Sequence, residues 1–208
     1  MIIKVCGMRD PENIRAVEAL GIDLMGFIFW PHSSRYVGGR PAYLPAHCRR
    51  AGVFVDATEQ DILAAVKDFQ LDVLQLHGHE TPEAIAALKE RAAALNPAIR
   101  IVKSLAVKGP EDLAQTKAYE DVCDAFLFDT KGKLPGGNGQ QFDWNVLRAY
   151  RGRLPFLLSG GIGPDDGPRI RAFDVPGCLG IDLNSRFETA PGQKDVEALR
   201  TFIETVRQ

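Results

Sequence analysis

Short hydrophobic runs alternate with longer segments of helical periodicity from one end of the chain to the other. Several runs are apolar on both alternate faces, which is typical of parallel strands buried on both sides. Regular alternation of strand and helix predicts βαβ units and a parallel sheet. The eight runs are Ile2–Cys6, Leu24–Phe29, Ala51–Val55, Val73–Leu76, Ile99–Ser104, Ala125–Asp129, Pro155–Ser159 and Cys178–Leu183.

The segments between the runs repeat apolar residues at helical spacing, and two of them open with helix-start signals. Thr58 is a suitable N-cap, and Thr81 is followed by Pro82 and Glu83, which favour a first helical turn. We predict helices in four places on this basis. They are Asn13–Leu20, Ile62–Val66, the segment that starts after Thr81, and Val196–Val206.

Eight strand–helix units predict an α/β fold, a (β/α)8 TIM barrel that forms a single domain over residues 1–208. This length is near the lower limit for such a barrel. The connection from Pro31 to Pro45 is rich in proline and glycine and has room for only a short helix. An open doubly wound sheet is the alternative, but it usually has fewer strands. It also favours Gly-x-Gly-x-x-Gly after the first strand, and that motif is absent here.

Composition narrows the class of protein. The net charge is −2 and no basic block occurs, which argues against a nucleic-acid partner. No apolar stretch is long enough to span a bilayer, and the N-terminus lacks the three-part pattern of a signal peptide. We therefore expect a cytoplasmic protein with no membrane partner, compatible with a monomer. Its four cysteines are far apart in the sequence and are expected to be free thiols.

Polar residues stand near the carboxyl ends of several runs, where a barrel of this type carries its active site. Strand alternation puts Cys6 on one face with Lys4, and Gln75 on one face with His77. Bulky apolar neighbours would face the helices, so the polar side chains should converge on the barrel mouth. Buried charges need partners or a ligand there. The set is Lys4, Cys6, Gln75, His77, Asp129 and Asp182.

Cys6 and Asp129 are the candidates for chemistry, and each has a structural alternative. Cys6 is either a small core residue or a catalytic thiolate, which needs a nearby positive charge such as Lys4 to lower its pKa. Asp129 is either a cap or loop partner of Lys131, or a general acid that burial keeps protonated. His77 and His79 lack further ligands at suitable spacing, so we predict no metal and a structural His77.

Two glycine-containing segments follow the seventh and eighth runs, the position where barrel enzymes frequently bind phosphate. Ser159–Gly163 includes Gly160 and Gly161, and the second segment is Gly180–Ser185. Glycine lets the backbone approach a ligand closely. The alternative is a pair of ordinary turns. A third glycine-rich segment, 131–139, is either a lid over the substrate or a surface loop.

Taken in order, these motifs resemble the phosphoribosylanthranilate isomerase family of tryptophan biosynthesis. The resemblance covers nearly the whole chain, and the ordered set is far more specific than any one piece. The pieces are Lys4–Met8, Gly26–Phe29 with Ser33–Val37, Val53–Val55, Gln75–Gly78, Phe128–Thr130 with Gly136–Gly139, Ser159–Ile162, and Gly180–Ser185 with Glu188. The stretch Asn184–Phe187 is bulkier than the small residues associated with that turn in the family.

The resemblance implies a small-molecule substrate, N-(5-phosphoribosyl)anthranilate. Its Amadori rearrangement gives 1-(o-carboxyphenylamino)-1-deoxyribulose 5-phosphate without a metal or organic cofactor. By the same resemblance Asp129 would be the general acid, Cys6 the general base, and Arg35 the ligand of the anthranilate carboxylate. The implied phosphate-binding residues are Gly160, Gly161, Asn184 and Ser185, and the supporting residues are Lys4, Gln75, His77 and Asp182.

Two other functions compete with this interpretation. The related aminoaldose isomerase of the histidine pathway uses paired aspartates, whereas the first run here ends in Cys6. A non-catalytic barrel that binds a phosphate ligand would keep the glycines of Ser159–Gly163 but would need neither Cys6 nor Asp129.

Overall fold

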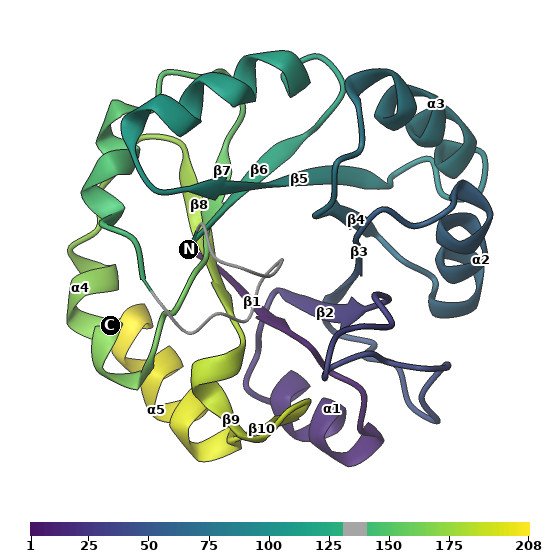
Figure 1. Ribbon diagram of the computed structural model, residues 1–208. Coiled ribbons are helices and arrows are strands. Elements are labelled where there is room, and N and C mark those ends of the chain that lie inside the picture. Colours follow the sequence, from purple (N-terminus) through teal and green to yellow (C-terminus); the bar gives the residue numbers. More distant parts are fainter. Residues whose placement is uncertain (131–140) are drawn as a thin grey trace.

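The eight predicted runs form one closed parallel barrel in the computed structural model, which describes residues 1–130 and 141–208. The strands pair in chain order, and β8 closes the barrel by pairing in parallel with β1 (Figure 1). This closure excludes the open sheet. The strands are β1 (Ile2–Cys6), β2 (Leu24–Ile28), β3 (Arg49–Phe54), β4 (Val73–Leu76), β5 (Arg100–Val107), β6 (Ala125–Thr130), β7 (Phe156–Leu158) and β8 (Cys178–Leu183).

Helices surround the barrel, and all four predicted helices are present (Figure 1). The Thr58 side chain accepts a hydrogen bond from the backbone N–H of Asp61, and Thr81 accepts one from Ala84, so both predicted N-caps are confirmed. The α-helices are α1 (Pro11–Glu18), α2 (Glu59–Phe69), α3 (Pro82–Ala93), α4 (Gly167–Arg171) and α5 (Val196–Arg207). The 3-10 helices of the described residues are η1 (Pro110–Tyr119), η2 (Trp144–Ala149), η3 (Pro164–Asp166) and η4 (Ser185–Phe187).

The connection between β2 and β3 contains no helix, not even the short one for which the sequence leaves room. Its prolines lack the N–H donors that a helix requires. The loop instead folds back along β2, where Tyr36 forms an isolated parallel bridge with Ile28. This return carries Arg35 to the barrel mouth.

A small hairpin lies outside the eight-stranded barrel. It consists of β9 (Glu188–Ala190) and β10 (Gln193–Lys194) and lies between η4 and α5 in the chain.

Two apolar layers follow from the alternation of the strand side chains. Leu127 packs inside the barrel, whereas its neighbours Phe126 and Phe128 face outward and contact Tyr150. Because one face fills the barrel and the other meets the helices, polar residues at the carboxyl ends of the strands share a mouth. The interior cluster consists of Leu24, Ala51, Val73, Val102, Leu127 and Leu157.

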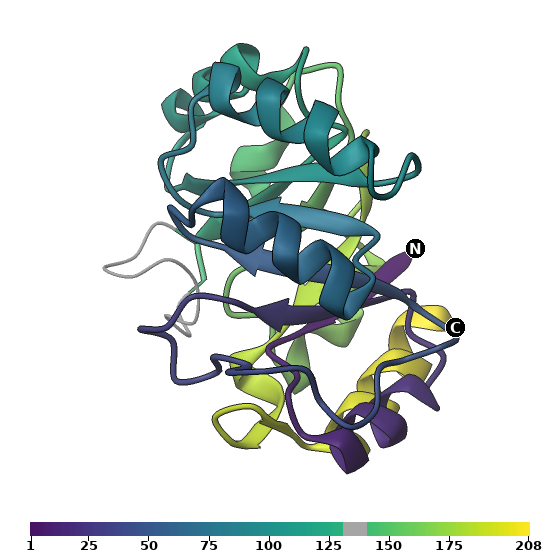
Figure 2. The same ribbon diagram turned by 90° about the vertical axis from the view of Figure 1, so that its right-hand side faces the viewer.

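Both termini lie at the end of the barrel away from the strand arrowheads (Figure 2). The carboxyl ends of the strands therefore form a separate face. Across the described parts of the chain, we find no helix with the length and apolar character needed to cross a membrane. The four cysteines are free thiols, as expected.

Barrel closure predicts a sensitive glycine. A Cβ at Gly180 on β8 would lie 1.9 Å from the carbonyl oxygen of Ile2 on β1. That oxygen belongs to a paired strand and cannot move away without disturbing the ladder. We expect Gly180→Ala to lower the free energy of unfolding in urea by roughly 2 kcal/mol or more. Gly39→Ala is the control, because no atom lies within 4 Å of its Cβ position. Equal losses in both variants would contradict this account.

Candidate active site

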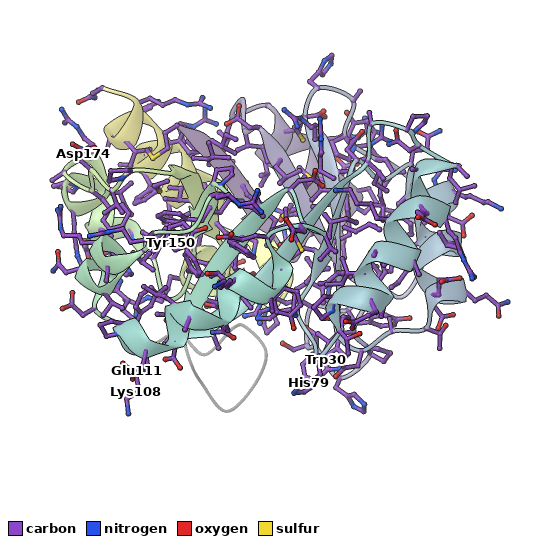
Figure 3. The ribbon with its side chains drawn as sticks, turned by 90° about the horizontal axis from the view of Figure 1, so that it is seen from above. Trp30, His79, Lys108, Glu111, Tyr150 and Asp174 are labelled. Atoms are coloured by element: carbon purple, nitrogen blue, oxygen red, sulfur yellow. The ribbon has the colours of Figure 1, made fainter. Side chains whose placement is uncertain are left out.

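One cavity opens at the carboxyl ends of the barrel strands, and every predicted site residue except Lys4 lines it. The predicted residues come from β1, β4, β6 and β8 and from the segments that follow β2, β4, β7 and β8. Figure 3 shows Trp30, which also lines the cavity, at the same end of the barrel as His79. The predicted residues found together are Cys6, Arg35, Gln75, His77, Asp129, Gly160, Gly161, Asp182, Asn184 and Ser185.

Lys4 lies beneath the cavity and forms a buried ion pair with Asp182. Its Nζ donates a hydrogen bond of 2.8 Å to Asp182 Oδ1, across the register that joins β1 to β8. Burial raises the pKa of Asp182, and the positive charge of Lys4 opposes that rise. Burial would lower the pKa of Lys4, but Asp182 and Cys6 reverse the direction and raise it. Lys4 is therefore a charged ammonium held next to Cys6.

Cys6 stands at the end of β1 with 3 % of its surface exposed. Burial raises the pKa of its thiol above the ordinary value, while the positive charges of Lys4 and Lys194 act in the opposite direction. Lys4 thus favours the thiolate as the sequence suggests, but burial outweighs it. The resting group is a thiol. The thiolate forms only when the thiol proton passes to another group.

Asp129 ends β6 inside the same cavity, with 6 % of its surface exposed. Burial raises the pKa of its carboxyl to about 6, although the Thr130 N–H donates to Oδ1 at 2.8 Å and lowers it. A Cβ at Gly160 would lie 3.1 Å from Asp129 Oδ1, so the glycine loop after β7 closely approaches the carboxyl. A carboxyl that titrates near neutral pH can serve as a general acid.

His77 faces the cavity as a neutral ring. Burial, followed by the positive charges of Lys103 and Lys4, lowers its pKa to about 4. Its Nε2 lies 3.7 Å from Asp129 Oδ2, too far for a direct hydrogen bond. His79 points elsewhere: its side chain is 96 % exposed and pairs with Asp56. Within residues 1–130 and 141–208, no group of three or more His, Cys, Asp or Glu side chains is arranged to hold a metal ion.

Arg35 is held by Glu188 at the rim of the cavity. Arg35 Nε donates to both carboxylate oxygens at 2.9 Å, and Nη2 donates to Oε2 at 2.7 Å. Burial would raise the pKa of Glu188, but Arg35 and Lys194 hold it below the ordinary value, so Glu188 is ionised. The guanidinium has five N–H donors. Glu188 engages one side of the guanidinium, and Arg35 itself lines the cavity.

Gly160 and Gly161 form the turn after β7 with φ values of +91° and +67°. These left-handed conformations favour glycine and bring the backbone to the cavity wall. On the next strand, Asn184 follows β8 and Ser185 opens η4. The two loops therefore lie side by side on neighbouring strands, as the sequence predicts for a phosphate site. The predicted lid at 131–139 falls outside the described residues.

The family model for N-(5'-phosphoribosyl)anthranilate (PRA) isomerase matches residues 3–205. The chain belongs to this family. A relative in Phocaeicola vulgatus is 51% identical over 208 residues, covering 100% of this chain and 98% of the relative. One in Parabacteroides distasonis is 44% identical over 212 residues, covering 99% and 93%. Both are N-(5'-phosphoribosyl)anthranilate isomerases.

Solved structures of the family share the whole fold. The Thermotoga maritima phosphoribosyl anthranilate isomerase superimposes with a TM-score of 0.81 at 29% identity, covering 100% of this chain and 99% of that one. A family structure with reduced 1-(o-carboxyphenylamino)-1-deoxyribulose 5-phosphate has a TM-score of 0.77 at 28% identity, with coverage of 100% and 99%. The chain is thus an isomerase of tryptophan biosynthesis. The motif resemblance is confirmed, and family membership favours it over the histidine-pathway enzyme and the non-catalytic barrel.

Sequence reasoning missed two residues of this family member's site. Trp30 lines the cavity directly after β2, and an aromatic residue just beyond a strand end was the available signal. Lys194 contacts Glu188 and Asn184 from β10. It had no such signal, because a lysine outside the strand–helix repeat is ordinarily solvent-exposed.

Asp129 should make stability depend on pH. The folded protein holds its proton more tightly than the unfolded chain, where the pKa is about 3.9. The free energy of unfolding therefore falls as the pH rises from about 4 to above 6. Asp129→Asn keeps an acceptor for Thr130 and removes the charge. We expect it to be up to about 3 kcal/mol more stable than the parent at pH 8, with little difference near pH 4.

Urea unfolding of both proteins at several pH values measures this difference. Asp68→Asn is the matched control, because it removes an exposed carboxylate on α2 and should show no comparable pH dependence. A gain at pH 8 that persists undiminished at pH 4 would argue against an uncharged, buried Asp129 at acid pH.

Proposed function

We propose that this cavity performs the Amadori rearrangement of N-(5-phosphoribosyl)anthranilate, with Asp129 as general acid and Cys6 as general base. The observation that carries the assignment is the placement of both side chains in one cavity, at the ends of β6 and β1. Strands β7 and β8, with their glycine and asparagine loops, lie between them. A phosphate bound to those loops would leave the ribose within reach of both groups.

The reaction requires one proton donor and one proton acceptor at different sugar atoms. Asp129 donates to the ring oxygen as the C1–O bond breaks, which opens the furanose and gives a cationic Schiff base. That cation acidifies the hydrogen on C2. Cys6 removes this proton, and the electron pair forms an enolamine, which tautomerises to the ketone of 1-(o-carboxyphenylamino)-1-deoxyribulose 5-phosphate. Each positioned proton-transfer group typically contributes about 10²–10⁴-fold to the rate.

The protonation states of the pair suit this sequence of steps. At neutral pH the prevailing form is a carboxylate at Asp129 and a thiol at Cys6, because their pKa values lie at about 6 and above the ordinary thiol value. The reactive form, acid and thiolate, holds the same number of protons. It is reached by redistribution within the pair and needs no proton from outside. A bound phosphate would raise the Asp129 pKa further and favour the acid.

The aromatic end of the substrate fits the rim after β2. Arg35 offers a planar guanidinium, which suits bidentate recognition of a carboxylate. Trp30 belongs to the same loop, lines the cavity and offers an aromatic surface to an anthranilate ring. The substrate would thus extend from the β2 loop across the mouth to the loops after β7 and β8. The monomeric state and cytoplasmic location expected from the sequence remain predictions.

Removing either catalytic group should affect turnover rather than binding. We expect Cys6→Ala and Asp129→Ala each to lower kcat by about 10²–10⁴-fold, because each variant loses one proton transfer. Affinity for the reduced product analogue should change little, as neither group is assigned to hold the phosphate or the carboxylate. Loss of anthranilate-substrate fluorescence measures turnover, and calorimetry measures affinity.

Cys48→Ala provides the control, since this half-buried thiol precedes β3 and does not line the cavity. Its turnover should match that of the parent. Near-normal kcat in Cys6→Ala or Asp129→Ala would remove that residue from its assigned role.

Arg35 should determine affinity for the carboxylate. We expect Arg35→Ala to weaken binding of the reduced product analogue by on the order of tenfold or more in calorimetry, as a charge-assisted contact is lost. Arg35→Lys should recover only part of the affinity, because lysine keeps the charge but lacks the planar fork. Arg40→Ala removes an exposed arginine from the same loop and should bind normally. Unchanged affinity in Arg35→Ala would place the carboxylate elsewhere.

A further inference from the structure

A fully buried lysine on the β9–β10 hairpin lies behind the active site. The Lys194 side chain has 0 % exposure. Its Nζ donates to Glu188 Oε1 at 2.6 Å and to Asn184 Oδ1 at 2.8 Å. The first partner holds Arg35, and the second lines the cavity next to Ser185. An ammonium ion is costly to bury, so these two bonds define where it can reside.

We propose that Lys194 is a positioning residue that ties the two ends of the substrate site together, holding Arg35 through Glu188 at the carboxylate end and Asn184 at the phosphate end. The inference rests on the proposed function, because that function assigns the two ends.

The carboxylate end depends on the charges around Glu188. This one carboxylate accepts hydrogen bonds from both Arg35 and Lys194, so the three-residue cluster carries a net charge of +1. A substrate carboxylate would complete a neutral group of four charges. Without the lysine, Glu188 alone would neutralise Arg35, and the guanidinium would attract an incoming carboxylate less strongly. Lys194 therefore keeps the positive charge of Arg35 available to a ligand while Glu188 fixes its direction.

The phosphate end depends on the orientation of Asn184. Because Lys194 donates to Oδ1, the amide oxygen of Asn184 is turned toward the hairpin. The amide nitrogen, with its two N–H donors, is then the group suited to an anion in the cavity.

Gly7 lies next to residues of both ends of the proposed site. A Cβ at this position would lie 2.8 Å from Arg35 Cδ and 2.9 Å from Asn184 Oδ1. The bare backbone after β1 is thus a common support for both side chains.

The hairpin is anchored so that the ammonium cannot shift easily. Lys194 pairs with Glu188 across β9 and β10, so the ion pair is also a cross-strand pair. Asn13 of α1 binds the backbone of Lys194 on both sides, accepting from its N–H at 2.8 Å and donating to its carbonyl at 2.9 Å. Figure 1 shows β9 and β10 next to α1 and α5. The hairpin, an addition to the eight-stranded barrel, is on this account part of the binding site.

Lys194→Met tests the inference, because methionine keeps much of the length and removes the charge. Calorimetry would use three probes: the reduced product analogue, anthranilate for the carboxylate end, and ribose 5-phosphate for the phosphate end. We expect affinity for the analogue to fall by about tenfold, and both smaller probes to bind more weakly. KM should rise, and kcat should fall far less than in Cys6→Ala, because loss of the Lys194 charge raises the pKa of the Cys6 thiol but leaves both proton-transfer groups in place.

Two further variants separate the arms. Arg35→Ala should weaken anthranilate and leave ribose 5-phosphate unaffected, whereas Asn184→Ala should do the reverse. Each keeps Lys194 in place, so the test survives if Lys194→Met does not fold. Weakening of only one probe by Lys194→Met, or of both probes by each single-arm variant, would overturn the tie.

Lys103→Met is the matched control. It removes another buried lysine, whose Nζ lies 3.0 Å from Glu80 Oε2 on the far side of the mouth. It should cost comparable stability in urea but leave the affinities for anthranilate and ribose 5-phosphate unchanged. Equal weakening of both probes in Lys103→Met would mean that general destabilisation explains the effect. Absence of turnover and of analogue binding in the parent protein would instead refute the proposed function.

Discussion

The ion pair between Lys4 and Asp182 joins the last strand of the barrel to the first. The two residues are register partners on β1 and β8, and both side chains are buried. Removing one partner from such a pair typically costs about 3–5 kcal/mol, because the other charge is left without compensation. Closure of the barrel and the floor of the active site therefore depend on the same contact. Any change in strand register would separate the two charges and displace Cys6 as well.

The charges around the mouth divide it into two halves. Lys4 and Lys194 favour the thiolate of Cys6 on the side of β1 and β8. At Asp129, on β6, burial is the largest effect and raises the carboxyl pKa, Lys4 lowers it less, and the neighbouring His77 is neutral. The lysines therefore lower the pKa of the Cys6 thiol without overcoming the effect of burial, whereas burial raises the pKa of the Asp129 carboxyl to about 6. On the proposed function, these two local effects act on the base and on the acid of one site.

Much of the fold follows from local sequence patterns. Alternation within strands was sufficient to place Cys6 and Asp129 on the inward face, because a one-residue shift would have put bulky phenylalanines inside the barrel. The N-caps at Thr58 and Thr81 were equally local. The helix-free return after β2 was only half foreseen, since proline excludes a helix without determining the path that replaces it. That path is what brings Arg35 to the mouth, so its placement depended on the family resemblance.

The site residues that could not be predicted are those whose roles arise from tertiary contacts. Lys194 lies on a two-residue strand, which is too short to show a periodic pattern of apolar residues. Its side chain contacts Glu188 and Asn184, and its backbone contacts Asn13. No sequence pattern links these residues to Lys194. The raised pKa of the Cys6 thiol was also hidden, because the sequence reveals the neighbouring lysine but not how completely the thiol is removed from water.

These hidden features share a physical cause. A closed barrel provides strand ends in a ring, but its interior is apolar and disfavours charge. The proposed substrate has two anionic groups, a phosphate and a carboxylate, and binding them favours cations at the mouth. Each buried cation in turn needs a nearby anion, which should not cancel the charge that the substrate meets. Asp182 compensates Lys4 within the strands, where the register provides the partner. Arg35 and Lys194 share Glu188, and the barrel alone has no strand to carry that carboxylate and its second cation. The hairpin between β8 and α5 supplies both, which explains why a ring of eight strands is followed by two more.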